Sequence, residues 1–213
     1  WLKDADPSEL KELKEVTKRI DAVKKLRAES SRETTKKLAA YPALFGEDRQ
    51  PKSEYILIPR HSSENRKYIP LGFFNKNYIV SDSCLFVENA KLFHFGVLMS
   101  GMHMTWVKYI CGRIKSDFRY SNEMVYNNYT WPENPNEKHI KAIELAAQKV
   151  LDVRAEFPLS SLADLYDPLT MPPKLVKAHQ ALDKAAKTNA IAKNKASRLK
   201  SRLTKLVAKS SAK

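Results

Sequence analysis

The sequence predicts an α+β fold in which a small, mostly antiparallel sheet is packed with helices. Three observations predict it: apolar residues recur at spacings of three and four near both ends of the chain, short aromatic and β-branched runs fill the middle, and polar turns divide those runs. A length of 213 residues allows one domain with an extension or two small domains. We expect a long N-terminal helix before the sheet region and a helical part with a basic tail after it.

Helices are expected over residues 1–50. Asp6 can cap the first helix, because its carboxylate accepts hydrogen bonds from free backbone N–H groups. The apolar stripe of this long helix consists of Leu10, Leu13, Val16, Ile20, Val23 and Leu26. A second helix opens at Ser30 or Ser31 and stops before Pro42.

From Glu54 the hydrophobic period changes to that of strands. Strands are expected at residues 55–59, 67–74, 78–80, 84–87, 113–120 and 124–131. Two mostly buried helices lie between the fourth and fifth of these, one over 90–99 with Asn89 as its cap and one over 101–111 that ends at Gly112. Prolines at 132 and 135 end the sheet region.

Helical periodicity returns after these prolines. An amphipathic helix starts at Pro135 or Asn136, a short helix covers 160–166, and a last helix begins near Lys174. The chain is therefore expected to divide into residues 1–50, 51–132, 133–184 and a basic helical tail, 185–213.

Charge is distributed unevenly along the chain. Lys and Arg number 38 and Asp and Glu 24, a net charge of +14 that suggests a polyanionic partner. Residues 174–213 hold twelve basic side chains and one acid, or +11, whereas residues 1–173 hold 26 basic and 23 acidic side chains, or +3. The bulk charge therefore belongs to the C-terminal stretch.

Composition excludes several protein classes. Hydrophobic residues at 43% are too many for a wholly disordered chain, and the most apolar stretch, 92–107, is too short to span a membrane. Cys84 and Cys111 lie in apolar surroundings, which argues against a disulfide framework and for a reducing compartment, the cytoplasm.

The sequence carries none of the common enzymatic motifs: no Gly-x-Ser-x-Gly, no phosphate-binding glycine loop and no His-Glu-x-x-His. His94 and His103 are nine residues apart and do not converge on a metal, so they are interpreted as ordinary helix histidines. The segment Asn128–Pro132 is only faintly similar to the Asn/Asp-Pro-Pro-Tyr loop of amino-methyltransferases. No catalytic or metal-binding residue is assigned.

Residues 112–121 carry a more specific pattern. If they form one strand, Lys115, Asp117 and Arg119 share one face. Lys and Arg donate to guanine O6 and N7, and Asp accepts from the cytosine amino group, so this row suits the reading of base edges in a major groove. On the residues alone, a solvated face of mutually neutralising charges is the simpler interpretation.

A basic, hydroxyl-rich loop, residues 60–67, separates the first two expected strands. Its candidate phosphate-contacting side chains are Arg60, Ser62, Arg66 and Lys67. An ordinary exposed hairpin loop remains the alternative.

Several short segments of the sequence resemble one known family. Residues 1–184 closely resemble the C-terminal third of the MmeI-like restriction–modification enzymes. The strings that carry the resemblance are 55–60 (Tyr-Ile-Leu-Ile-Pro-Arg), 68–73 (Tyr-Ile-Pro-Leu-Gly-Phe), 94–98, 102–107, 126–132 (Tyr-Asn-Asn-Tyr-Thr-Trp-Pro) and 161–173.

The resemblance implies a function for this chain and assigns the enzymatic activities to other domains. These enzymes join a nuclease, an adenine-N6 DNA methyltransferase that uses S-adenosylmethionine, a target-recognition domain and a C-terminal helical part. Residues 1–132 would belong to the target-recognition domain, and the nuclease, with any Mg²⁺, and the methyltransferase would lie upstream of Trp1. In relatives the positions that correspond to Lys115, Asp117 and Arg119 decide which bases are read, which favours the readout interpretation.

On this basis the chain is expected to bind duplex DNA, with Lys115 and Asp117 reading one G·C pair and Arg119 a neighbouring one. Alone it is expected neither to methylate nor to cut. The tail departs from the resemblance, because residues 187–206 are similar to the end of the bacterial small-subunit ribosomal protein numbered twenty. A structural RNA-binding protein, with RNA contacts through residues 185–213, is therefore the alternative.

Overall fold

A computed structural model describes residues 2–189. The chain forms two compact units, residues 1–50 and residues 51–213. The predicted tail from residue 190 onward lies outside the described residues. No helix within residues 2–189 is both long enough and apolar enough to cross a membrane.

The first unit is helical, as its sequence predicts. It contains α1 (Pro7–Glu12), α2 (Lys14–Ala28), α3 (Glu33–Lys37) and a 3₁₀ turn at Leu38–Ala40. The Asp6 carboxylate caps α1 by accepting from the Ser8 amide at 2.8 Å, but the expected long helix is interrupted at Leu13, whose φ of −87° and ψ of 76° are not helical.

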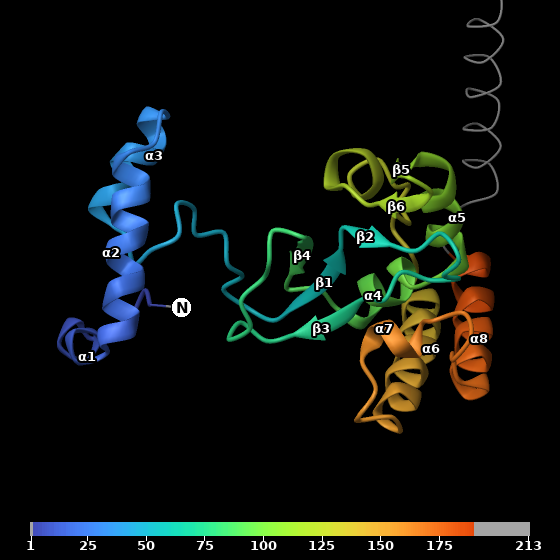
Figure 1. Cartoon of the computed structure of the whole chain (residues 1–213). Coiled ribbons are helices and arrows are strands. Elements are labelled where there is room, and N and C mark those ends of the chain that lie inside the picture. Colours follow the sequence, from blue (N-terminus) through green and yellow to red (C-terminus); the bar gives the residue numbers. More distant parts are fainter. Residues whose placement is uncertain (1, 190–213) are drawn as a thin grey trace, which may run out of the picture. The chain divides into compact units, whose positions relative to one another are not determined.

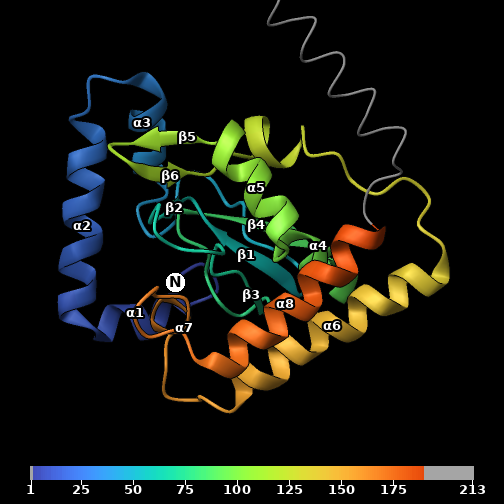
Figure 2. The same ribbon diagram turned by 90° about the vertical axis from the view of Figure 1, so that its right-hand side faces the viewer.

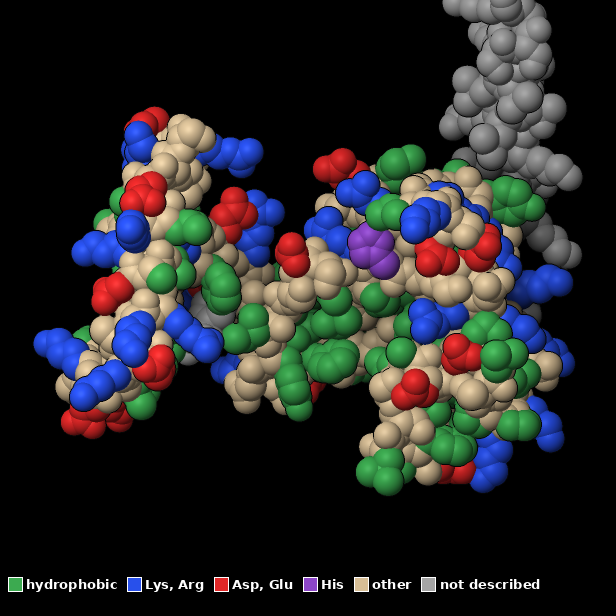
Figure 3. All heavy atoms as spheres, viewed as in Figure 1, with side chains coloured by type: hydrophobic (Ala, Val, Ile, Leu, Met, Phe, Trp, Pro, Cys, Tyr) green, Lys and Arg blue, Asp and Glu red, His purple; other side chains and the backbone are tan. Residues whose placement is uncertain are grey.

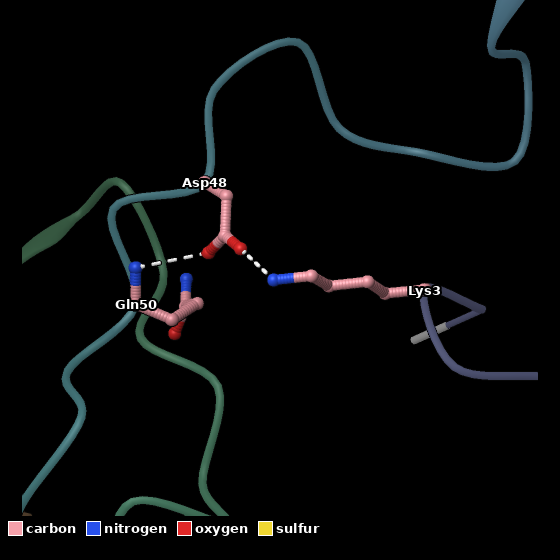
Figure 4. Close-up of polar contacts among 3 residues, drawn as sticks. All are labelled: Lys3, Asp48 and Gln50. Atoms are coloured by element: carbon pink, nitrogen blue, oxygen red, sulfur yellow. Dashed lines mark hydrogen bonds and ion pairs between the residues drawn. The ribbon is translucent and has the colours of Figure 1, made fainter.

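Polar contacts close this unit because its apolar stripe buries little. Among residues 2–50 no residue is fully buried. The Arg27 guanidinium donates to the carbonyls of Leu38, Tyr41 and Leu44 at 3.1, 2.8 and 2.8 Å, which joins α2 to the segment after α3. Lys3 forms an ion pair with Asp48, whose other oxygen accepts from the Gln50 amide at 3.2 Å (Figure 4).

The second unit holds two three-stranded antiparallel sheets. The first has the order β3-β1-β4 and the second β2-β6-β5. The strands are β1 (Tyr55–Pro59), β2 (His61–Ser62), β3 (Gly72–Phe74), β4 (Cys84–Glu88), β5 (Gly112–Ile114) and β6 (Asp117–Arg119). Figure 1 shows both sheets at one side of the unit and a group of helices at the other.

Up to residue 189, five α-helices accompany these sheets. They are α4 (Leu92–Leu98), α5 (Gly101–Ile110), α6 (Glu137–Ala155), α7 (Leu162–Leu165) and α8 (Pro173–Asn189). α6 and α8 run side by side (Figures 1 and 2). α4 crosses α6 so closely that a Cβ on Gly96 would lie 2.6 Å from the Ile143 side chain. One buried core extends from Ile56 through Phe95 and Phe118 to Leu182.

Several local predictions for the second unit are wrong. The expected strand at 67–74 is reduced to Gly72–Phe74, and residues 78–80 form no strand. Residues 122–126 form a π-helical segment where a strand was expected at 124–131. The Ser121 hydroxyl accepts from the Met124 amide at 3.1 Å and so starts a helical turn. The cap of α4 is Lys91 and not Asn89, which has a φ of +53°.

Candidate nucleic-acid interface

The predicted reading segment and the predicted phosphate loop meet in the second sheet. β2, which begins inside the loop, pairs with β6 (Figure 1). The paired residues are His61 with Arg119, Ser62 with Phe118, Gly112 with Arg119, Arg113 with Phe118 and Ile114 with Asp117. Sequence patterns did not predict this pairing, because the two partners are more than fifty residues apart.

The two faces of this sheet differ. Phe118 is 1% exposed and its partner Ser62 is 4% exposed, so their face packs against the core. Asp117 and Arg119, which alternate with Phe118, are exposed on the opposite face together with His61. We call the exposed set His61, Ile114, Asp117 and Arg119 the outer face. Figure 3 shows basic and acidic side chains interspersed over the end of the unit that carries β5 and β6.

The core holds β6 from the inner side. The Tyr120 amide donates to the Arg60 carbonyl at 2.7 Å, which fixes the register of β2 against the end of β6. Within the core, the His103 Nδ1 lies 2.9 Å from the Leu98 carbonyl and the Nε2 lies 3.1 Å from the Tyr120 hydroxyl. A carbonyl only accepts, so Nδ1 carries the proton and Nε2 accepts from Tyr120. Burial lowers the pKa of His103 to about 4, so the ring is neutral near pH 7.

The structure corrects the position of Lys115. Residues 113–120 form a hairpin and not one strand, and Lys115 lies in its turn with a φ of +55°. This left-handed conformation is uncommon for a residue with a side chain. The Arg113 guanidinium lies 4.0 Å from the Phe118 ring centroid and donates to the Ser116 carbonyl at 2.8 Å, so it stabilises the turn. Lys115 therefore projects from the tip of the hairpin beside the outer face.

Asp117 joins β6 to the neighbouring loop. Its Oδ1 accepts a hydrogen bond from the Glu64 amide at 3.1 Å. Within residues 2–189, by contrast, the side chains of Lys115 and Arg119 have neither a hydrogen-bond partner nor an ion-pair partner. Two unpaired cations and one carboxylate thus lie within a few residues on one exposed hairpin.

The four side chains predicted to contact phosphate differ in their exposure. Lys67 is exposed, and Arg60 and Arg66 are half-buried, each with a buried Nε that makes no hydrogen bond. The Arg66 Nη2 donates to the Ala163 carbonyl at 3.4 Å. Ser62 points into the core opposite Phe118, so its hydroxyl is not on the binding surface that the sequence predicted.

Two members of the outer face were not among the predicted site residues. His61 lies opposite Arg119, and Ile114, 43% exposed, lies opposite Asp117. Nothing in the spacing of either residue signals this, because strand pairing and not sequence distance brings them there. An exposed apolar side chain beside a carboxylate can contact a thymine methyl group.

The other chemical candidates have structural roles. The His94 Nδ1 accepts from the Lys91 amide at 3.0 Å at the start of α4. Met99 and Met104 are core residues, and Cys84 and Cys111 are unpaired thiols. No group of three or more His, Cys, Asp or Glu side chains within residues 2–189 is arranged to hold a metal ion.

Comparisons with known proteins give a consistent result. The family model described as the MmeI target recognition domain matches residues 1–133, and the model of the MmeI C-terminal domain matches residues 135–211. The second match includes residues 187–206, the part of the tail whose sequence resembles a ribosomal protein.

Two relatives show how much of a longer protein these residues represent. DNA methyltransferase A of Bacillus subtilis strain 168 is 39% identical over 183 residues, which cover 86% of this chain and 21% of the relative. A solved structure, described as the type IIL restriction–modification enzyme MmeI in complex with DNA, matches with 45% identity and a TM-score of 0.82. That match covers 88% of this chain and 25% of the solved chain. The chain therefore spans between a fifth and a quarter of these relatives.

Proposed function

The chain belongs to the MmeI family, of which it contains the target recognition and C-terminal domains, and on this premise we propose that it reads a short sequence in duplex DNA for a site-specific adenine methyltransferase. The observation that carries the proposal is the pairing of β2 with β6. It brings the basic loop and the outer face together at one end of the unit. Support also comes from the solved MmeI structure, which contains DNA.

Affinity and specificity come from different groups. Arg60, Arg66 and Lys67 carry positive charge next to the outer face, and contacts of this kind with phosphate hold a duplex in register without reading it. Bulk charge, including that of residues 174–213, adds affinity that weakens with salt. Neither source distinguishes one base pair from another.

Base readout is assigned to the hairpin. Lys115 at its tip donates to guanine O6 and N7, and Asp117 accepts from the amino group of the paired cytosine, so that together they read one G·C pair. Arg119 donates to a guanine of a neighbouring pair. Each good contact contributes about 1–3 kcal/mol of discrimination against the wrong base.

The chemical step belongs to the rest of a longer protein. We propose that methyl transfer to adenine N6, with S-adenosylmethionine as the methyl donor, occurs in a methyltransferase domain outside these residues. Support for this comes from the curated relative, of which this chain represents about a fifth. DNA cleavage with Mg²⁺, where the longer protein has it, falls outside these residues in the same way.

The test is selection of duplexes from a random library by the 213-residue chain, followed by sequencing. The double variant Lys115→Glu with Asp117→Arg should select a motif in which one G·C position has changed. The matched control is Lys149→Glu with Asp152→Arg, which inverts two exposed charges on α6 at the same net charge and should select the original motif.

An unchanged motif at full affinity in the Lys115/Asp117 variant would overturn the assignment of readout to these two residues. The proposal as a whole would be overturned by the absence of any selected motif together with sequence-indifferent affinity for folded RNA that disappears when residues 190–213 are removed. That outcome would favour the structural RNA-binding alternative.

A further inference from the structure

We infer that His61 is a specificity-determining residue that reads DNA beside Arg119, so that the reading surface extends from the β5–β6 hairpin onto β2. This inference deepens the proposed function and rests on it. It starts from one pair in the sheet, in which His61 of β2 lies directly opposite Arg119 of β6. Both side chains are exposed.

The pairing fixes the direction of both side chains. Directly paired residues of antiparallel strands project to the same face, with Cβ atoms about 4.5–5.5 Å apart. On its other side Arg119 is paired with Gly112, which has no side chain. The histidine ring is therefore the cross-strand neighbour of the Arg119 guanidinium in this row.

The register of β2 is held at both ends. The Tyr120 amide donates to the Arg60 carbonyl at 2.7 Å before His61, and the Glu64 amide donates to Asp117 at 3.1 Å after it. Between these bonds Ser62 and Phe118 are buried. A slip of one residue would turn His61 into the core and Ser62 outward, so the outward position of His61 is built into the fold.

The spacing and chemistry of this row suit two adjacent base pairs. Neighbouring strands lie about 4.8 Å apart, and successive base pairs of B-DNA are stacked about 3.4 Å apart. Two side chains that extend from adjacent strands can therefore reach successive base edges. The Arg119 guanidinium offers only donors, whereas a neutral imidazole offers one donor and one acceptor, so His61 adds a kind of contact that arginine cannot make.

The competing role for an exposed histidine is a contact with phosphate. The two roles differ in what they predict. A phosphate contact weakens binding to all sequences about equally, whereas a base contact weakens discrimination at one position. The Arg60, Arg66 and Lys67 side chains already supply cations within the loop, and His61 differs from them because it lies on the outer face and opposite a proposed base-reading residue.

The experiment uses four variants of the 213-residue chain and selection from the same random duplex library. The variants are His61→Ala, Arg119→Ala, the double variant and the control His139→Ala, which removes an imidazole at the start of α6. We expect His61→Ala to lower discrimination about tenfold at one base pair, adjacent to the pair relaxed by Arg119→Ala. His139→Ala should keep the full motif.

The double variant measures whether the two side chains act together. We expect its loss of affinity for the selected duplex to differ from the product of the two single losses by threefold or more, because the residues are direct neighbours. Unchanged thermal unfolding of His61→Ala would exclude a folding defect as the cause.

Three results would overturn the inference. His61→Ala with the full motif and full affinity gives the histidine no role, and a uniform loss of affinity for all duplexes makes it a phosphate contact. Both leave the proposed function intact as long as the unsubstituted chain selects a motif. If the unsubstituted chain selects none, the proposed function and the inference fail together.

Discussion

Two arginines of the second unit occupy opposite environments. Arg154 on α6 is 9% exposed, and its guanidinium donates to the Tyr166 hydroxyl at 2.9 and 2.6 Å and to the Leu71 carbonyl at 2.8 Å. Arg119 is exposed and has no hydrogen-bond or ion-pair partner within residues 2–189. Each guanidinium nitrogen of Arg154 bonds to the protein, whereas the guanidinium of Arg119 is available to a ligand.

The buried arginine begins a network that joins the sheets to the C-terminal helices. The Tyr166 hydroxyl contacts the His179 Nε2 at 2.7 Å, and the His179 ring stacks on Tyr68 with centroids 4.0 Å apart. The Tyr68 hydroxyl then donates to Asp183 at 2.7 Å. The same carboxylate accepts from the Gly101 amide at 2.5 Å, at the start of α5.

The proposed DNA-reading face is therefore separate from the buried groups that hold this fold together. The family models divide the chain near residue 134, yet the polar network and the hydrophobic core both continue across that point. The helices after the division therefore support the sheets before it. The outer face can vary in its side chains because no part of that network passes through it.

Replacing each arginine in turn by methionine should distinguish the structural role of Arg154 from the proposed binding role of Arg119 most clearly. Arg154→Met leaves the Leu71 carbonyl buried without its donor and removes both bonds to Tyr166, so we expect a loss of about 3–5 kcal/mol of unfolding free energy. Arg119→Met should change stability by less than about 0.5 kcal/mol and weaken binding to the selected duplex. Urea unfolding and duplex titration measure the two effects.

A third variant serves as the control for the unfolding and binding measurements. Arg19→Met removes a charge from an exposed position on α2 and should change neither the unfolding midpoint nor the recognised motif. If Arg154→Met unfolds at the same urea concentration as the unsubstituted chain, the network is not what holds the helices to the sheets.

Acid should destabilise the second unit through two buried histidines, His179 of this network and His103 beneath β6. Burial lowers the pKa of His103 to about 4, and burial together with the charge of Arg154 lowers the pKa of His179 to about 3. The unfolded chain binds these protons near pH 6.5, so it holds more protons than the folded chain below that pH. Stability is therefore complete above pH 6.5 and falls as the pH decreases toward 4.

Between pH 7 and pH 5.5 we expect each histidine to cost about 1 kcal/mol of unfolding free energy, measured by urea unfolding at a series of pH values. His179→Gln and His103→Gln should each reduce the slope of stability against pH, even if they lower its value at pH 7. His139→Gln, at the start of α6, is the control. A slope that survives both buried substitutions would assign acid sensitivity to other groups.

The sequence predicted those elements whose signals are local. α6 begins after Asn136, whose side chain accepts from the His139 amide at 2.9 Å, and its inner residues Ile143, Ala147 and Val150 are buried as their spacing predicts. The strand expected at 124–131 failed because Ser121 and Asn128 bond to nearby backbone and stabilise a helical turn instead. Apolar content alone did not distinguish these outcomes.

The candidate site was predictable only in part, for a related reason. Alternation correctly placed Asp117 and Arg119 on one face, but no glycine or asparagine marked the turn at Lys115. The pairing of His61 with Arg119 depends on two segments that the core brings together. Such pairings have no signature in a single sequence, so the extent of the outer face appears only in the structure.

Lys115 combines a left-handed backbone conformation with a proposed base contact, and a glycine there should reveal both contributions. Its φ of +55° costs a residue with a Cβ about 1–2 kcal/mol, while glycine loses about 0.5–1 kcal/mol in chain entropy on folding. Lys115→Gly should therefore raise the unfolding free energy by about 0.5–1 kcal/mol and still weaken recognition of one base pair, because the ammonium is gone.

Lys115→Ala keeps the backbone cost and loses the same ammonium, so it should show the binding defect without the gain in stability. If both variants bind the selected duplex as well as the unsubstituted chain, the hairpin tip is a turn and not a reading residue, and base readout on this sheet is limited to the outer face.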